Sequence, residues 1–176
     1  MEDKVIWTIG HSTRSFSEFL ELLQHNSIKL LVDVRSLPGS RKFPQFNKEN
    51  LENELPANGI KYQHMIALGG RRKVHKDSKN TAWRNSSFQG YADYMESEEF
   101  MEALNQLEEM SASESTCFMC SEAVWWRCHR SMISDALKLD GWEVQHILSL
   151  KKLEEHPYTS PATICNGQLI YHSQNK

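Results

Sequence analysis

The segment CSEAVWWRCHRS, residues 120–131, holds two cysteines among basic side chains. Cys120 ends an apolar run, and Cys128 precedes a helix-like run. There the helix N-terminus, together with Arg127 and Arg130, would lower the pKa of a thiol. A thiolate is the form of cysteine that acts as a nucleophile or a redox group. The segment therefore indicates a reactive-thiol site, with small buried cysteines as the alternative.

Two other uses of the cysteines fit less well. Cys117 and Cys120 have CxxC spacing, but they lie in a strand-like run, so their side chains are expected on opposite faces. Cys128 and His129 would need a second pair of metal ligands. The loop from Cys120 to Arg127 resembles the cysteine-to-arginine loop of tyrosine phosphatases and rhodaneses only in spacing, because it has no glycine and two tryptophans. We therefore expect no metal and no such loop.

The same segment also suits anion recognition. Backbone N–H groups at a helix start and the forked guanidinium groups of Arg127 and Arg130 can bind phosphate or carboxylate groups. Structural ion pairs with Asp33 or Glu122 are the alternative use of a single arginine. Aromatic side chains could stack on a planar group, with a place in the core as the alternative; they are Trp125, Trp126, Phe43 and Phe46. The other candidate ligand-binding residues are Gly10, Ser12, Thr13, Arg35, Arg41, Asn47, Gly69, Gly70, Arg71 and Trp126.

Acid–base groups stand after two further strand-like runs. His11 lies in GHST and Asp33 in DVR, and a histidine with a carboxylate can serve as a general base and its orienting partner. The alternatives are a histidine bonded within its own turn and an aspartate that tethers the backbone or an arginine. The candidate catalytic residues are Cys120, Cys128, His129, His11, Asp33 and Glu122.

The order of the elements predicts that these residues meet. Strands are expected within residues 5–10, 28–36, 60–68, 116–120 and 142–148, and helices within 15–26, 47–59, 88–110 and 129–141. This alternation predicts a single-domain, three-layer α/β sandwich with a mostly parallel, Rossmann-like sheet and helices on both faces. Asn166-Gly167 predicts a small antiparallel edge pair near the C-terminus.

Ligands bind at the carboxyl ends of the strands in such sheets. Four loops are therefore expected at one edge, which are residues 10–13, 33–36, 68–72 and 120–131. The segment 69–87 is long and polar, so we expect a lid or binding loop there, with a mobile insert as the alternative.

Composition limits the class of protein. The chain has 176 residues and a net charge of -3, which favours one domain over residues 1–176 and disfavours wholesale coating of nucleic acid. No apolar run of about 18 residues and no leader pattern occurs, so we expect a cytoplasmic protein with reduced thiols and no membrane partner. P-loop NTPases, dinucleotide dehydrogenases, zincins and α/β-hydrolases are excluded, because their motifs are missing.

The ordered set TIGHSTRS, LLVDVRSLPGSRKFPQFN, LGGRR, FQGYADYM and MCSEAVWWRCHRSMISDAL resembles the prokaryotic family catalogued as domain of unknown function 488. The resemblance covers about residues 5–148 and leaves 149–176 as an extension. It implies a compact α/β domain but supplies no reaction. The positions that match its motifs are Gly10, His11, Ser12, Thr13, Asp33, Arg35, Pro38, Gly39, Arg41, Phe46, Asn47, Gly69, Gly70, Cys120, Glu122, Arg127, Cys128, His129 and Arg130.

Three hypotheses follow for the function. The first is a thiol-dependent transferase or hydrolase that binds a small anionic ligand, nucleotide-like or derived from nucleic acid, at the carboxyl edge of the sheet. The second is a non-catalytic nucleotide or nucleic-acid binding module in which the cysteines only pack. The third is a metal-stabilised structural protein. The sequence leaves the cofactor, the reactive cysteine and the oligomeric state open.

Overall fold

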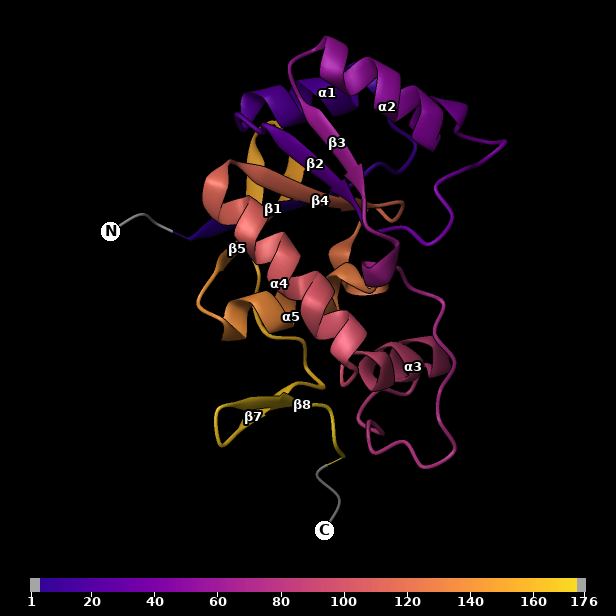
Figure 1. The fold of residues 1–176 in the computed structure, drawn as a ribbon, viewed down its shortest axis with the longest axis vertical. Helices are drawn as coiled ribbons and strands as arrows, with labels where there is room; N and C mark the ends of the chain where they lie inside the picture. Colours follow the sequence, from indigo (N-terminus) through magenta and orange to yellow (C-terminus); the bar gives the residue numbers. More distant parts are fainter. Residues whose placement is uncertain (1–3, 174–176) are drawn as a thin grey trace.

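The computed structural model describes residues 4–173, and a six-stranded sheet lies at its centre (Figure 1). The order of the strands is β3-β2-β4-β1-β5-β6; the first five run parallel, and β6 pairs antiparallel with β5. The strands are β1 (Val5–Gly10), β2 (Leu30–Asp33), β3 (Lys61–His64), β4 (Thr116–Cys120), β5 (Glu143–Ser149) and β6 (Lys152–Glu155). The predicted α/β fold with a mostly parallel sheet is confirmed.

Helices cover both faces of the sheet (Figure 1). The helices are α1 (Phe16–His25), α2 (Lys48–Ala57), α3 (Ser86–Tyr94), α4 (Glu98–Ser113) and α5 (Arg130–Leu139). Apolar residues of α1 and α2 pack with Ile9, Cys117 and Met119, whereas those of α4 and α5 pack with Phe118 and Cys120. Cys117 and Cys120 therefore lie on opposite faces, as their spacing predicts.

Local sequence explains where the helices begin and end. Ser15 and Glu18 form a capping box at the start of α1, and Ser97 caps α4. Gly141 follows α5 with a φ of 95°, which glycine adopts without strain. Asn47 stands at the N-cap position of α2 but does not cap it with its side chain; its Oδ1 accepts a hydrogen bond from the backbone N–H of Ser40 instead. It ties the loop before α2 to the helix.

The structure differs from the expectation at two places. The third strand ends at His64, because Ile66–Leu68 forms a 3-10 turn, and the antiparallel strand β6 was not predicted. The predicted antiparallel pair near the C-terminus is confirmed: β7 (Thr163–Cys165) and β8 (Gln168–Ile170) form a two-stranded sheet of their own. Among residues 4–173, no helix is both long enough and apolar enough to cross a membrane.

Candidate functional site

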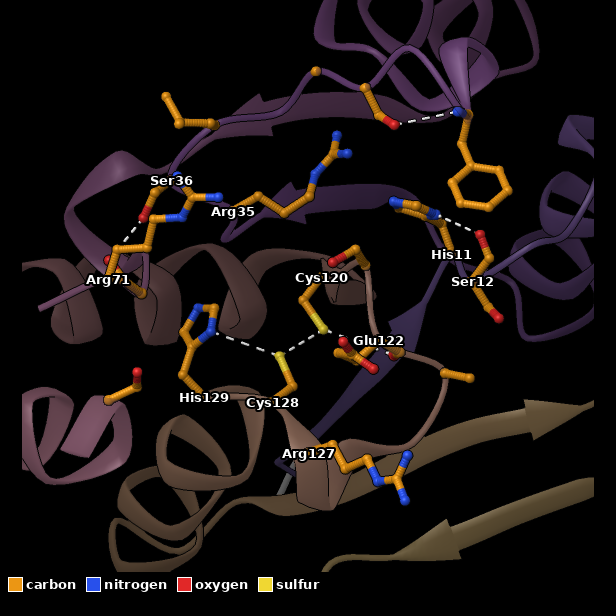
Figure 2. A pocket seen from close by; sticks show the side chains of 18 of the residues that line it. His11, Ser12, Arg35, Ser36, Arg71, Cys120, Glu122, Arg127, Cys128 and His129 are labelled. Carbon is orange, nitrogen blue, oxygen red and sulfur yellow. Dashed lines mark hydrogen bonds between the residues drawn. The ribbon is translucent and has the colours of Figure 1, made fainter. Parts of the chain in front are cut away.

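A cavity of about 670 Å³ lies at the carboxyl ends of β1, β2 and β4, where the sequence predicts a site (Figure 2). The loops after these three strands and the start of the loop after β3 all contribute to its wall. The predicted residues that line it are His11, Ser12, Thr13, Arg35, Gly70, Arg71, Cys120, Glu122, Arg127, Cys128 and His129.

The other predicted residues lie outside the lining. Gly10, Asp33 and Arg130 are buried behind the cavity wall, and Asn47 and Gly69 hold neighbouring loops. Arg41 and Trp126 are exposed and away from the lining. Phe43, an expected stacking residue, also lines the cavity. Lining residues that the sequence did not indicate as site residues are Ser36, Leu37, Gly39, Ser40, Lys42, Ser87, Phe88, Tyr91, Ser121 and Ala123. The length of segment 69–87 was the available signal for Ser87 and Phe88, which stand at its far end.

Two free thiols meet at the floor of the cavity. The Sγ atoms of Cys120 and Cys128 lie 2.6 Å apart, and these residues are 2% and 6% exposed. Cys120 ends β4, and Cys128 returns to it after the 3-10 turn Trp125–Arg127, directly before α5. A small movement would bring the sulfurs to the disulfide bond length of about 2.05 Å. The loop thus joins two thiols that are eight positions apart in sequence.

Arg130 lies buried beside the thiol pair. Each nitrogen of its guanidinium group donates a hydrogen bond, either to a thiol of the pair or to a residue next to it. Its Nε donates to Cys120 Sγ at 2.9 Å, Nη1 to Thr8 Oγ1 at 2.8 Å and Nη2 to the carbonyl of Glu122 at 2.7 Å. Its backbone N–H points to Cys128 Sγ at 3.4 Å. A Cβ on Gly10 would lie 1.6 Å from that same Glu122 carbonyl, so glycine is required for the loop to cross the end of β1.

These contacts make one thiol of the pair acidic. Burial opposes ionisation of Cys128, but the hydrogen bond with Cys120 and the charge of Arg130 outweigh it and lower the pKa of Cys128 to about 7. Burial, together with the neighbouring Cys128, raises the pKa of Cys120. The first proton is therefore lost easily, and the second is held between the two sulfurs. One thiolate near neutral pH is the expected state of the pair.

His129 is oriented to exchange a proton with Cys128. Its Nε2 lies 2.9 Å from the carbonyl of Val34, which can only accept, so Nε2 carries the proton. Nδ1 is then free to accept, and it faces Cys128 Sγ at 3.6 Å. Burial lowers the pKa of His129, which keeps the ring neutral. A Cβ on Gly70 would lie 3.2 Å from Nδ1, so the absence of a side chain there makes room for this ring.

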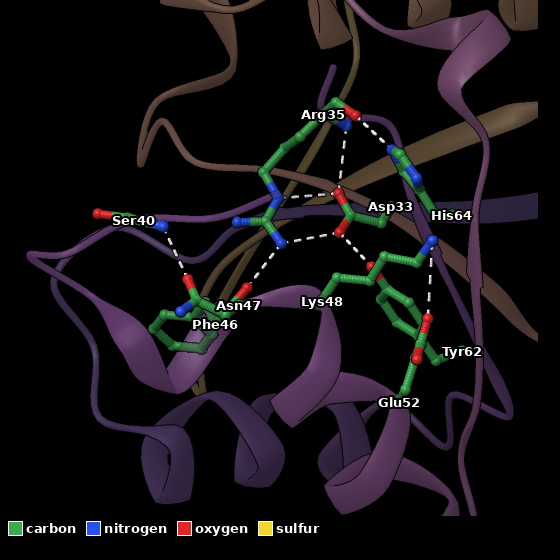
Figure 3. A network of polar contacts seen from close by, with 9 residues as sticks. All are labelled: Asp33, Arg35, Ser40, Phe46, Asn47, Lys48, Glu52, Tyr62 and His64. Atoms are coloured by element: carbon green, nitrogen blue, oxygen red, sulfur yellow. Dashed lines mark hydrogen bonds and ion pairs between the residues drawn. The ribbon is translucent and has the colours of Figure 1, made fainter. Parts of the chain in front are cut away.

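Asp33 and Arg35 form a rigid pair at the end of β2 (Figure 3). Nε and Nη2 of Arg35 donate to the two carboxylate oxygens at 2.9 and 2.8 Å, and Nη2 also donates to the carbonyl of Phe46. Tyr62 adds a hydrogen bond to Asp33 Oδ2 at 2.5 Å. Asp33 thus tethers an arginine, the alternative that the sequence left open. Nη1 of Arg35 has no hydrogen-bond partner among residues 4–173 and is available to a ligand in the cavity.

His11 is a second neutral imidazole at the cavity. Its Nδ1 donates to the carbonyl of Ser12 at 2.9 Å, so Nε2 is the unprotonated nitrogen. Burial lowers the pKa of His11 to about 4, with nearby Arg35 acting in the same direction. The ring stacks on Phe46 at 4.4 Å. His11 makes no hydrogen bond with Asp33 in the described part of the chain; it bonds within its own turn.

The lining is rich in cations. Arg35, Lys42, Arg71 and Arg127 line the cavity against one carboxylate, that of Glu122. Ser12 and Arg71 both adopt positive φ angles, 50° and 61°, which L-residues other than asparagine and aspartate seldom do. Phe43 and Phe88 add aromatic surface to the same lining. The cavity is thus suited to an anionic ligand with a planar part.

No group of three or more histidine, cysteine, aspartate or glutamate residues in the described range 4–173 could hold a metal ion. What the site offers is a thiol pair, two neutral imidazoles and three lining guanidinium groups, of which that of Arg35 is fixed by Asp33. These suit nucleophilic attack by sulfur on an anionic substrate.

Comparison with known proteins agrees with the resemblance read from the sequence motifs. Searches of the curated proteins and of the solved structures found no match. Among protein families, residues 15–137, more than half of the chain, match the family described as Domain of unknown function DUF488. The match includes both thiols, Arg130 and the Asp33–Arg35 pair but ends before β5. The chain therefore belongs to the DUF488 family.

Proposed function

We propose that this protein is a thiol-dependent transferase or hydrolase that acts on an anionic, nucleotide-like ligand in the cavity. One observation carries the proposal: Cys128 Sγ lies between a hydrogen-bonding thiol, a buried arginine and a neutral imidazole nitrogen, at the wall of a cavity lined by four cations. This set supplies a nucleophile, a proton acceptor and an anion site.

Cys128 is the better nucleophile of the pair. It is the more exposed thiol, the lowering of its pKa favours its thiolate, and its Sγ faces His129 Nδ1. In the first step the Cys128 thiolate forms a bond between Sγ and the electrophilic atom of the ligand while the bond to the leaving group breaks, and the leaving group departs with the electron pair of that bond. In the second step water or an acceptor hydroxyl gives its proton to His129 and attacks, and the electron pair of the S–ligand bond returns to Sγ.

The anion site rests on the guanidinium groups. Arg35 is fixed by Asp33 with Nη1 left for the ligand, and Arg71 and Arg127 line the cavity from two other loops. Phosphate and carboxylate groups match the forked donors of arginine. Phe43 and Phe88 offer aromatic surface for a base, which favours a nucleotide over a simple carboxylate.

Binding tests the anion site. We expect pyrophosphate and ADP to bind the protein in calorimetry and Arg71→Gln and Arg127→Gln each to weaken binding about tenfold, because each removes charge-assisted hydrogen bonds. Arg41→Gln is the matched control, since Arg41 is exposed and outside the lining. Equal affinities for all these proteins would contradict an anion site in this cavity.

Chemistry tests the thiol. Incubation with a panel of nucleotides is expected to give either turnover or an adduct seen by intact mass spectrometry, and Cys128→Ser is expected to abolish both. Cys165→Ser is the control, because Cys165 is exposed and lies on β7. Turnover that survives Cys128→Ser would refute the assignment of the nucleophile.

The second candidate is a non-catalytic binding module, favoured by the near-complete burial of both thiols. It predicts that the arginine variants lose binding while Cys128→Ser does not, with neither turnover nor adduct for any ligand. A steep dependence of affinity on salt would then identify nucleic acid as the ligand.

Because the described cysteines are free thiols, we also propose a reducing, cytoplasmic location.

A further inference from the structure

A chain of buried polar side chains runs from the thiol pair along the face of the sheet that α5 covers, toward the segment after β6. Nη1 of Arg130 donates to Thr8 Oγ1 at 2.8 Å, and that oxygen lies 2.6 Å from His146 Nδ1. His146 Nε2 lies 2.9 Å from His156 Nδ1, and His156 Nε2 lies 2.8 Å from Asp135 Oδ1. Thr8, Asp135 and His146 are 0% exposed, and His156 and Arg130 are 1% exposed.

Each group in this series of hydrogen bonds donates to the next one, in the direction from Arg130 to Asp135. Thr8 Oγ1 accepts from Arg130, and its own proton has no acceptor among the described residues other than His146 Nδ1. His146 must then carry its proton on Nε2 and donate to His156, which in turn donates from Nε2 to Asp135. A buried cation is thereby linked to a buried carboxylate through one hydroxyl and two imidazole rings.

Both ends of the chain are fixed. The Asp135 carboxylate also accepts from the backbone N–H and hydroxyl of Thr159 and from the hydroxyl of Tyr171, all within 3.0 Å. Near the middle, Trp125 stacks on His146 with the ring centroids 4.8 Å apart and the planes 8° apart. Arg130 has no carboxylate in direct contact in the described part of the chain, so its placement depends on these hydrogen bonds.

We propose that Thr8, His146, His156 and Asp135 are positioning residues that hold the Arg130 guanidinium against Cys120 and thereby set how readily the thiol pair ionises. Three of them, Thr8, His146 and His156, lie outside the matched family region of residues 15–137, as do Thr159 and Tyr171. The strands β1 and β5 and the C-terminal segment would thus control a thiol that they do not touch. The use of this control in catalysis rests on the proposed function, but its test needs no ligand, so the two proposals can fail separately.

Electrostatics is consistent with a neutral imidazole at His146, in the middle of the chain. Burial, with His156 and Arg130 acting in the same direction, lowers the pKa of His146 to about 2. The other titratable or charged groups of the described residues that face the thiols or Arg130 are His11, Arg14, Arg35, Tyr91, Cys117, Glu122 and His129. A substitution at Thr8 changes none of them, so it isolates the effect of the chain.

The experiment compares Thr8→Val with Thr8→Ser. Valine is similar in size to threonine, and serine is smaller, so both fit the site. Only serine keeps the hydroxyl that joins Arg130 to His146. The readout is the rate of alkylation of Cys120 and Cys128 against pH, resolved by peptide mass spectrometry so that Cys117 and Cys165 do not contribute. We expect Thr8→Val to raise the apparent pKa of the pair by about one unit and to slow alkylation about fivefold near neutral pH, with Thr8→Ser close to the unmodified protein.

His156→Gln and His156→Leu repeat the comparison at the far end. Glutamine offers one acceptor and one donor, as the assigned ring does, so only leucine is expected to shift the titration. Identical pH profiles for Thr8→Val and Thr8→Ser would overturn the proposal.

The unmodified protein provides a measurement that no folding defect can obscure. ¹⁵N chemical shifts of the imidazole groups are expected to show His146 and His156 both protonated on Nε2 and not on Nδ1. A proton on Nδ1 of either ring would reverse the direction of the chain and overturn the proposal even if Thr8→Val does not fold.

Discussion

Arg35 and Arg130 are both buried, and each has a carboxylate associated with it, but the association differs. Arg35 contacts Asp33 directly through two hydrogen bonds, which leaves Nη1 facing the cavity. All three guanidinium nitrogens of Arg130 donate hydrogen bonds to protein atoms. Arg130 is connected to Asp135 only through Thr8 and two histidines. One arginine is neutralised at contact distance, and the other is not.

This difference separates two tasks. A guanidinium paired with a carboxylate has little net field, but its orientation is fixed, so Arg35 suits the recognition of a ligand group. A guanidinium without an adjacent carboxylate keeps its full electrostatic effect on its neighbours. For Arg130 these neighbours are the sulfur atoms of Cys120 and Cys128. In turn, the thiols outweigh the effect of burial and raise the pKa of Arg130, so it stays charged. Under the proposed function, ligand recognition and thiol activation would therefore use different arginines.

Arg130→Met should give the largest effect and would break the comparison most directly. The substitution removes the positive charge that stabilises the thiolate, so we expect the apparent pKa of the thiol pair to rise by roughly two units. The measurement is the ultraviolet absorbance of the thiolate against pH. Arg35→Met is the control and should leave this titration nearly unchanged; a shift of equal size in both variants would contradict the division of tasks.

Asp33→Asn tests the directly paired arginine. The substitution leaves a buried guanidinium without its counter-charge, so we expect the free energy of unfolding to fall by about 3 kcal/mol. Urea denaturation measures this loss. Tyr62→Phe is the milder control, since it removes one hydrogen bond to Asp33 and should lower stability by about 1 kcal/mol. A thiol titration displaced by Asp33→Asn would show that the two arginines are not independent.

The dependence of stability on acid pH tests the comparison further, because a buried histidine lies near each arginine: His11 near Arg35 and His146 near Arg130. His11 and His146 have pKa values lowered from 6.5 to about 4 and about 2, in each case chiefly by burial. Below pH 6.5 these histidines bind protons in the unfolded chain but not in the folded protein. The free energy of unfolding therefore falls as the pH drops from 6.5 through about 4. We expect His11→Gln to flatten this dependence by up to about 1.4 kcal/mol per pH unit. Unfolding curves at several pH values measure it, and an unchanged slope would mean that His11 is accessible to protons in the folded state.

Gly70→Ala should have the smallest effect, because the added Cβ would lie 3.2 Å from His129 Nδ1 and a shift of the ring by a few tenths of an ångström would relieve the contact. We expect the alkylation rate of Cys128 to fall about twofold without a change in the thiol titration, since Arg130 is untouched. Gly39→Ala is the control, as its nearest neighbour would lie at 4.0 Å. A large loss of stability in Gly70→Ala would show that the ring cannot move.

The fold was largely predictable because its strands and helices follow strong local patterns. The capping box at Ser15, the cap at Ser97 and the continuous apolar run of TCFMC each determine an element without distant information. The strand β6 was missed, because KLEE is polar and short and pairs only with the edge of β5. Its pairing depends on a partner strand rather than on its own residues.

The candidate site was predictable in location but not in detail. Residues that follow strands in a parallel sheet converge whatever their partners, so the sequence could place His11, Arg35 and Cys120 at one edge. It could not show that Arg130 turns away from the cavity toward Thr8, nor that His146 and His156 lie behind it. The contacts of Thr8 with Arg130 and His146 join residues more than a hundred positions apart, for which the sequence alone carries no spacing signal.

Arg71 shows how stability and recognition compete at a single position. Its left-handed backbone, with a φ of 61°, is a conformation that costs about 1 kcal/mol for a residue with a Cβ and nothing for glycine. A designer who optimised this backbone for stability alone would place a third glycine after Gly69 and Gly70 and would remove a cation from the cavity wall. The strained arginine is therefore a place where a more stable variant of this protein is expected to be a poorer binder of anions.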